Sequence, residues 1–401
     1  MLLKLLSSSV HRNLIFINKP AISFVQKATF ASLEEKPVSK PVDNASNNWG
    51  RELSAAAKYA HGPIKNTWRR EEVQAIFDSP LLELMYLSAQ VHRQHHDPRA
   101  VQQATLLSIK TGGCSEDCKY CPQSSSYSTA VKAEKMLDSG VIIEAAKRAK
   151  EAGSSRFCMG AAWRDVKGRK TNFKKIVSHI KEIKGMGMEV CCTLGMLDEA
   201  QAKQLKEAGL TAYNHNLDTS REFYPKIITT RSYDERLNTI NNVQNAGISV
   251  CSGGIIGLGE SEEDRVGLLT TLATLPIHPE SVPINALLAV KGTPLEDQKP
   301  VNIWEMIRMI CTARIIMPKA MVRLSAGRVR FSQVEQAMCF LAGANSIFTG
   351  DKLLTTPNND HNEDKIMLDL LGLVPKKANL QQGSDHPDYK PPRKNKQVME
   401  N

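Results

Sequence analysis

Apolar residues recur along the middle of the chain in one repeating order: an amphipathic helix, a glycine or proline that ends it, and a short apolar strand. The pattern predicts helices at 137–152, 173–184, 198–208, 233–246, 261–275, 303–317 and 332–342. It predicts strands at 104–109, 155–160, 189–194, 211–217, 248–252, 282–288, 321–324 and 346–349. Gly153 and Gly247 suit the left-handed end of a helix, and Asp198 suits its first position.

Helical crossovers between consecutive strands require a parallel sheet. Eight strand–helix units over roughly 250 residues predict an α/β fold, a (β/α)8 TIM-type barrel that is complete or nearly so. A doubly wound open sheet is the alternative. In a barrel, reactive residues gather at the carboxyl ends of the strands, so the loops after the strands are where a site is expected.

The two ends of the chain differ from this pattern. Residues 1–33 contain four basic residues and no acid, which is typical of a mitochondrial transit peptide and indicates the matrix; a secretory signal is less consistent with this composition. Residues 34–66 are interpreted as a linker and N-terminal extension, and 67–375 as the barrel. Residues 376–401, with six basic and three acidic residues, predict a basic disordered tail.

The charge of the 401-residue chain is +10, but much of it lies in these two ends. A body close to neutral disfavours a nucleic-acid-binding face, so no nucleic-acid partner is expected. No stretch reaches the roughly 18 uninterrupted apolar residues of a membrane span, and no membrane association is expected.

Three cysteines directly follow the first predicted strand, in the run KTGGCSEDCKYCPQ. Cys114, Cys118 and Cys121 have the spacing C-x3-C-x2-C. Their thiolates can hold three irons of a 4Fe–4S cluster and leave the fourth iron open. Structural zinc, a disulfide framework and unligated cysteines are weaker alternatives, because zinc prefers paired C-x2-C motifs and the predicted matrix is reducing.

A second group of side chains lies on predicted strands: Cys158, Cys191, Cys251 and Arg323. A buried arginine in an apolar strand is costly unless it is paired, so the four together predict a second metal site in the barrel lumen. Ordinary packing of free thiols is the alternative for each one alone. Cys192 must face the opposite side of the strand from Cys191. Cys311 and Cys339 fall in predicted helices and are expected to pack there.

The fourth predicted strand carries alternating polar residues. Asn214, Asn216 and Asp218 would share one face, able to bind ribose hydroxyls or a urea-like group. A helix-capping cluster is the alternative. Asn285, on a later strand, points to the same kind of site. Separately, His92 and His96 in one predicted helix, with His95 between them, have metal-ligand spacing but lack the glutamate of zinc proteases, so packing is the favoured interpretation.

The cysteine loop, with an aromatic residue just before its third cysteine, resembles the radical S-adenosylmethionine enzymes. Several further segments resemble the biotin synthases in particular: 156–163, 191–195, 213–224, 251–260, 282–285, 323–328 and 353–358. The resemblance spans about residues 80–372. It implies a sulfurtransferase that converts dethiobiotin to biotin, the last step of biotin biosynthesis, by radical insertion of sulfur between C6 and C9. It also implies a homodimer.

The resemblance implies roles for residues that match the family's motifs. Cys114, Cys118 and Cys121 would ligate a 4Fe–4S cluster; Cys158, Cys191, Cys251 and Arg323 a 2Fe–2S cluster that is the sulfur source; Asn216, Asp218 and Arg236 would bind S-adenosylmethionine; and Asn214, Asn285, Thr355 and Thr356 would line the dethiobiotin pocket. No side chain is expected to act as an acid or base. Cys192 departs from the family's pattern beside Cys191.

Further partners are implied in the same way: an electron donor of ferredoxin or flavodoxin type and the iron–sulfur assembly machinery. Two other functions stay open. A lipoyl synthase is another radical sulfur-inserting enzyme, but that family carries an additional cysteine motif near its amino terminus, and no cysteine precedes Cys114 here. A non-catalytic iron–sulfur carrier would need no polar strand face and would bind no S-adenosylmethionine.

Overall fold

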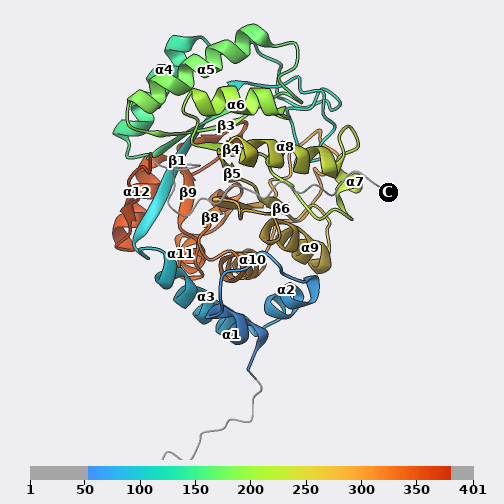
Figure 1. Cartoon of the computed structure of the whole chain (residues 1–401), viewed down its shortest axis with the longest axis vertical. Helices are drawn as coiled ribbons and strands as arrows, with labels where there is room; N and C mark the ends of the chain where they lie inside the picture. Colours follow the sequence, from blue (N-terminus) through green and yellow to red (C-terminus); the bar gives the residue numbers. More distant parts are fainter. Residues whose placement is uncertain (1–52, 381–401) are drawn as a thin grey trace, which may run out of the picture. The chain divides into compact units, whose positions relative to one another are not determined.

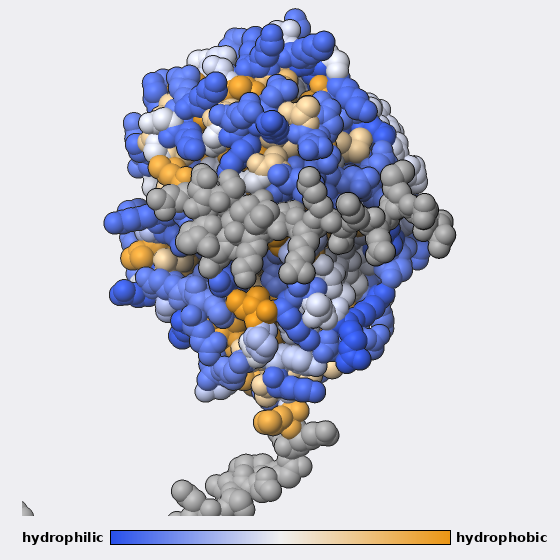
Figure 2. Space-filling view, viewed as in Figure 1, coloured by the Kyte–Doolittle hydropathy of each residue, from blue (hydrophilic) through white to orange (hydrophobic). Residues whose placement is uncertain are grey.

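The computed structural model describes residues 53–380. The predicted transit peptide, most of the linker and most of the tail therefore lie outside the described residues. Within them, helices surround a ring of strands (Figure 1). Among the described residues, no helix is both long and apolar enough to cross a membrane. The face in Figure 2 is mostly hydrophilic, with apolar side chains scattered over it.

The sheet is a closed parallel barrel, as predicted. Its strands are β1 (Ala100–Lys110), β2 (Arg156–Ala161), β3 (Glu189–Thr193), β4 (Ala212–Asn214), β5 (Ser249–Cys251), β6 (Gly254–Ile256), β7 (Ser281–Ala286), β8 (Met321–Leu324) and β9 (Ser346–Thr349). The ring runs in chain order, with β5 and β6 together filling one position beside β7. Because β9 pairs back onto β1, the sheet has no free edge, and the open-sheet alternative is wrong.

Seven helices connect the strands close to their predicted positions: α4 (Ser139–Glu151), α5 (Lys170–Gly185), α6 (Glu199–Glu207), α8 (Tyr233–Asn245), α9 (Glu262–Ala273), α10 (Ile303–Ile316) and α11 (Gln333–Leu341). Asp198 and Ser261 cap α6 and α9 through reciprocal hydrogen bonds with the third helical residue. Gly209 and Gly247 follow two of the helices with φ of +92° and +74°. Capping residues therefore set the helix ends where the pattern placed them.

Several elements were not predicted. Three helices precede the barrel: α1 (Ala55–Ala60), α2 (Arg70–Phe77) and α3 (Leu81–His95); of these, only the helix that contains His92 was expected. They pack against α9 and α10, beside which they lie in Figure 1. The others are short or late in the chain: α7 (Tyr224–Ile227), the hairpin β10 (Lys352–Leu353) and β11 (Thr356–Pro357), α12 (His361–Leu370) and β12 (Val374–Pro375). β12 pairs with the beginning of β1.

The core has two parts. The larger lies between the sheet and the helices, and the smaller lies inside the barrel. The inner cluster consists only of Ala104, Cys158, Cys191 and Ala212, with Leu106 and Phe348 packed against it. Barrel interiors are usually filled by bulky branched side chains. The small side chains here leave space in the lumen for something other than protein.

Candidate functional site

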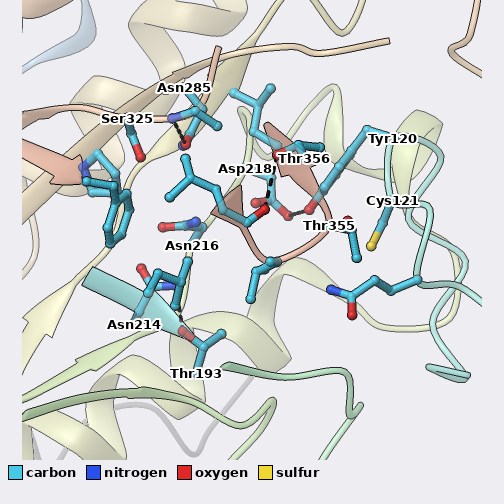
Figure 3. Close-up of a pocket in the computed structure, with 18 of the residues that line it drawn as sticks. Tyr120, Cys121, Thr193, Asn214, Asn216, Asp218, Asn285, Ser325, Thr355 and Thr356 are labelled. Atoms are coloured by element: carbon cyan, nitrogen blue, oxygen red, sulfur yellow. Dashed lines mark hydrogen bonds between the residues drawn. The ribbon is translucent and has the colours of Figure 1, made fainter. Parts of the chain in front are cut away.

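A cavity of about 320 Å³ lies at the carboxyl ends of the strands. Eleven of the fourteen predicted site residues line it: Cys121, Cys158, Cys191, Asn214, Asn216, Asp218, Arg236, Asn285, Arg323, Thr355 and Thr356. Cys114, Cys118 and Cys251 are the other three. Figure 3 shows the labelled polar side chains of different strands and loops arranged around one space. The cavity therefore brings together residues from each predicted group: the ligands of the first cluster, the ligands of the second cluster, the S-adenosylmethionine site and the dethiobiotin site.

The cysteine loop folds back on itself after β1. Cys121 N donates to Cys118 O (2.9 Å), and Cys114 N donates to Gln123 O (2.9 Å). Gly112 begins this turn with φ of +67°, and a Cβ there would lie 2.5 Å from a backbone oxygen, so only glycine fits. All nine cysteines of the chain are free thiols among the described residues. The loop thus holds three thiols together on a defined backbone.

The burial and protonation of these thiols bear on whether they can ligate iron. Burial raises the pKa of Cys118 to about 12 and that of Cys121 to about 11, so each thiol stays protonated unless a cation compensates its charge. Among residues 53–380, no group of three or more His, Cys, Asp or Glu side chains is arranged to hold a metal ion. A multi-iron cluster takes one thiolate per iron, so its ligands need not converge on one point. One buried thiol and two half-buried thiols on one loop fit such a cluster.

The two acids between the first two cysteines attach the loop to the turn before α8. Thr229 N and Thr230 N donate to Asp117 Oδ1 (2.9 and 3.2 Å), and the hydroxyls of both threonines donate to the same carboxylate. Burial alone would raise the pKa of Asp117, but these hydrogen bonds lower that pKa to about 2. The Thr230 hydroxyl also donates to Glu116. We call the contacts of Glu116 and Asp117 with residues 229–230 the latch.

A second set of contacts joins the loop to the predicted S-adenosylmethionine site. Tyr120 Oη donates to Asp218 Oδ2 (2.8 Å), as Figure 3 shows, and Arg236 Nη2 lies 2.6 Å from the same oxygen. Arg236 Nε in turn donates to Tyr224 Oη (2.8 Å). The ionised forms of Asp218 and Arg236 therefore neutralise one another beside Cys121, inside the cavity.

One part of the prediction for this segment is wrong. Asn214, Asn216 and Asp218 do not alternate along one strand, because β4 ends at Asn214. The chain then turns, and Asp218 has φ of +69° and pairs with Gly254 in an isolated bridge. All three residues still line the cavity, although the backbone after Asn214 is irregular. Asn216 is held there by its Oδ1, which accepts a hydrogen bond from Gly253 N (3.2 Å).

The second group of predicted ligands meets in the lumen. Cys158 on β2 and Cys191 on β3 are register partners, and both are nearly fully buried. Cys251 Sγ lies 3.9 Å from Arg323 Nη1. Cys192 belongs instead to the outer core between sheet and helices. Three thiols and a guanidinium from four strands fit a small iron–sulfur cluster, and the alternation of β3 directs Cys191 inward.

Arg323 is held by neighbours that sequence reasoning missed. Its Nε donates to Ser346 Oγ (2.8 Å), its Nη2 donates to Gln102 Oε1 (2.9 Å), and its guanidinium lies 4.5 Å from the centre of the Phe348 ring. All three polar side chains are fully buried. Two of its nitrogens are thus engaged by the barrel, and Nη1 faces Cys251.

The side chains predicted to contact substrate are fixed to different degrees. Asn214 Nδ2 donates to Thr193 Oγ1 (3.1 Å). Asn285 is bonded at both ends of its amide, donating to Gly254 O (2.8 Å) and accepting from Ala326 N (3.1 Å). Thr355 and Thr356 reach the cavity from the turn of the β10–β11 hairpin. The side chains of the two asparagines are therefore fixed by hydrogen bonds, whereas the threonines belong to a short hairpin.

Other cavity residues were missed, among them Trp163, Thr193, His215, Arg231 and Ser325. His215 lies one residue beyond the end of β4. Burial, with Arg231 and Arg236 nearby, holds its pKa well below the usual range, so it is neutral. Its position between the polar residues Asn214 and Asn216 was the sequence signal that could have identified His215 as a cavity residue.

The histidines of α3 are packed, as favoured. The rings of His92 and His96 lie 5.5 Å apart, and His96 Nε2 is 2.9 Å from Arg314 Nη1. Arg314 is fully buried, and its guanidinium donates to the carbonyls of Gly343, Pro318 and Ala320. A cation already occupies the position that a metal would need.

Comparison with known proteins agrees with this geometry. Two family models match: the Radical SAM superfamily at residues 108–272 and the Biotin and Thiamin Synthesis associated domain at residues 283–374. Two solved structures share the fold. Methylornithine synthase matches with a TM-score of 0.67 and 20% identity over 82% of this chain and 98% of that one. An FeFe-hydrogenase maturase matches with a TM-score of 0.71 and 17% identity over 82% and 77%.

Curated relatives are far more similar. "Biotin synthase, mitochondrial" of Arabidopsis thaliana is 72% identical over 328 residues, which cover 81% of this chain and 87% of that protein. Biotin synthase of Cytophaga hutchinsonii is 64% identical over 79% and 93%. "Biotin synthase, mitochondrial" of Emericella nidulans is 57% identical over 78% and 80%. The chain that builds this cavity from a cysteine loop and a cysteine-lined lumen therefore belongs to the biotin synthase family.

Proposed function

We propose that the chain converts dethiobiotin to biotin, inserting sulfur between C6 and C9 by radical chemistry. The observation that carries the proposal is the single cavity lined by Cys121 of the loop, Cys158 and Cys191 of the lumen, and polar side chains between them. A substrate held there would lie between two iron–sulfur sites. Family membership supports S-adenosylmethionine and iron–sulfur clusters as its cofactors.

Cys114, Cys118 and Cys121 would hold a 4Fe–4S cluster, and Cys158, Cys191, Cys251 and Arg323 would hold a 2Fe–2S cluster. When bound, these groups and S-adenosylmethionine supply hydrogen abstraction from unactivated carbon and a sulfide for insertion. The protein contributes position and exclusion of water. The latch ties the cysteine loop to the turn before α8, and the buried strand cysteines would hold the sulfur source.

Asn216, Asp218 and Arg236 would bind S-adenosylmethionine. The Asp218–Arg236 pair supports this, because it offers a carboxylate to ribose hydroxyls and a guanidinium to a carboxylate beside the cysteine loop. Asn214, Asn285, Thr355 and Thr356 would bind dethiobiotin. Rigid amides suit the ureido ring of that substrate, and the threonine hydroxyls can bind its carboxylate.

We further propose that the chain acts in the mitochondrial matrix, as a homodimer, with a ferredoxin- or flavodoxin-type electron donor and with the iron–sulfur assembly machinery. The acid-free leader and the mitochondrial relatives support the location. The proposed boundaries are 1–33 for the transit peptide, 34–66 for the linker and extension, 67–375 for the barrel and 376–401 for the tail. The first residues of that tail are not disordered, because Lys376 and Asn379 are hydrogen-bonded to the barrel.

The test is an anaerobic assay of the reconstituted protein with S-adenosylmethionine and a reductant, with and without dethiobiotin. The expected products are 5′-deoxyadenosine and biotin, with biotin only when dethiobiotin is present. Cys114→Ala should abolish both products, because two thiolates cannot hold the site-differentiated cluster. Cys311→Ala is the matched control, since that thiol is packed in α10.

The same assay excludes the other functions. A lipoyl synthase would cleave S-adenosylmethionine without forming biotin from dethiobiotin, and it would act on an octanoyl substrate. A protein that holds iron and sulfide but cleaves no S-adenosylmethionine would be a carrier. Either result would contradict the proposal.

A further inference from the structure

The chain returns to the amino end of the barrel after α12. There, residues 374–380, which we call the strap, run beside the beginnings of β1 and β3. Val374 N donates to Arg99 O and Lys376 N donates to Val101 O, both at 2.8 Å. Asn379 N then donates to Glu189 Oε1 (2.7 Å). The strap is thus hydrogen-bonded to the barrel at its amino end, opposite the mouth of the cavity.

Glu189 is the first residue of β3 and is fully buried. Its Oε2 accepts from Arg156 Nε (2.6 Å) and from Gln102 Nε2 (3.2 Å), while its Oε1 accepts from the strap. A buried carboxylate is tolerated only when its oxygens are bonded. The Asn379 N–H is the hydrogen-bond donor to Glu189 that comes from outside the barrel strands.

Glu189 sets the orientation of Gln102. An ionised carboxylate only accepts hydrogen bonds, so the amide nitrogen of Gln102 must face it. The amide oxygen then faces the lumen, where it accepts from Arg323 Nη2 (2.9 Å) and from Ser346 Oγ (3.1 Å). Reversing the amide would place NH2 against the guanidinium, where two donors meet. The direction of Arg323 Nη1 toward Cys251 therefore follows from Glu189.

We propose that the strap is a positioning element of the second metal site: the Asn379 N–H holds Glu189, Glu189 orients Gln102, and Gln102 aims Arg323 at the cluster. This inference rests on the proposed function, because it assumes that a 2Fe–2S cluster is bound by Cys158, Cys191, Cys251 and Arg323. It assigns a role to backbone at the end of the barrel farthest from substrate.

The test compares two substitutions at one residue in the full-length, reconstituted protein. Asn379→Pro removes the N–H, whereas Asn379→Ala keeps it and removes the same side chain. We expect the proline variant to lose its second cluster to a chelator about tenfold faster, the factor expected for one hydrogen bond to a charged group. Its 2Fe–2S absorption should shift, while the 4Fe–4S Mössbauer signal matches that of the alanine variant.

A pair of truncations keeps the test decisive if the proline variant does not fold. A chain ending at residue 376 lacks the Asn379 bond and should behave like the proline variant, whereas one ending at residue 380 should behave like the wild type. Equal rates of cluster loss within either pair would overturn the strap proposal. A wild-type protein that takes up only the 4Fe–4S cluster would instead contradict the proposed function.

Discussion

Two adjacent cysteines of β3 differ only in the side of the sheet that they face. Cys191 joins Cys158 and Ala212 inside the barrel, and Cys192 packs between sheet and helices. Both are buried, so burial cannot distinguish a ligand from a packing residue. The period of two residues along a strand does distinguish them.

We predict that Cys191→Ala loses the 2Fe–2S absorption and biotin formation, because it removes an iron ligand, whereas Cys192→Ala keeps both. The second substitution should lower the free energy of unfolding by about 1 kcal/mol, the effect of a small packed side chain. Iron content, visible spectrum and biotin yield of the two variants measure this. Cluster loss in Cys192→Ala alone would show that the ligand assignment is wrong.

The helices and strands of the barrel could be predicted because each carries its own pattern and ends at its own cap. Seven helices and the barrel strands lie within a few residues of the expected ranges. The latch could not be predicted, since Asp117 and Thr230 are 113 residues apart and no local pattern links them. For the same reason the sequence analysis missed Gln102 and Glu189, which meet only after the barrel closes.

The latch joins the cysteine loop to the turn before α8. Its loss should loosen the loop without removing any of the three cysteine ligands. We predict that Asp117→Ala still binds a 4Fe–4S cluster, because all three thiols remain. It should raise the KM for S-adenosylmethionine by about tenfold or more, because several hydrogen bonds to a charged group hold the loop beside Arg236.

The control is Asp138→Ala, an exposed acid before α4 whose side chain makes no capping bond. Initial rates of 5′-deoxyadenosine formation against S-adenosylmethionine concentration give the comparison. An unchanged KM in Asp117→Ala, with iron content equal to that of the control, would mean that the loop needs no latch.

For the molecule as a whole, α3, α10 and α11 are joined around the buried guanidinium of Arg314, which donates to Asn345 Oδ1 (3.0 Å) and Gly343 O (2.8 Å). Burial and the Arg314 charge lower the pKa of both His92 and His96 to about 3. Both rings are therefore neutral in the folded protein at pH values where the unfolded chain, with a histidine pKa of about 6.5, is protonated.

Stability should therefore be fully present above pH 6.5 and fall as the pH decreases below it. At pH 5 each of the two histidines lowers the free energy of unfolding by about 2 kcal/mol relative to its value above pH 6.5, because only the unfolded state binds the proton. Urea unfolding at pH 7 and pH 5 tests this in His96→Gln, which should lose less stability on acidification than the wild type. His61→Gln, at an exposed position, is the control, and equal losses in the two variants would contradict the prediction.

The proposed transit peptide lies outside the described residues. We predict removal of residues up to roughly 30 on import, because the segment is basic, acid-free and of transit-peptide composition. Amino-terminal sequencing of protein isolated from mitochondria measures it. Matrix protein that still begins at Met1 would contradict it.

The small side chains of the lumen have a consequence for how long the protein lasts in a cell. A barrel whose inner cluster is Ala104, Cys158, Cys191 and Ala212 forgoes the apolar packing that usually stabilises this fold. A cofactor that binds only the folded state stabilises it, and this stabilisation grows with the logarithm of the cofactor's concentration. When iron or sulfide is scarce, the chain should spend more time unfolded and be degraded faster. Its abundance would then report the supply of clusters even where its synthesis is constant.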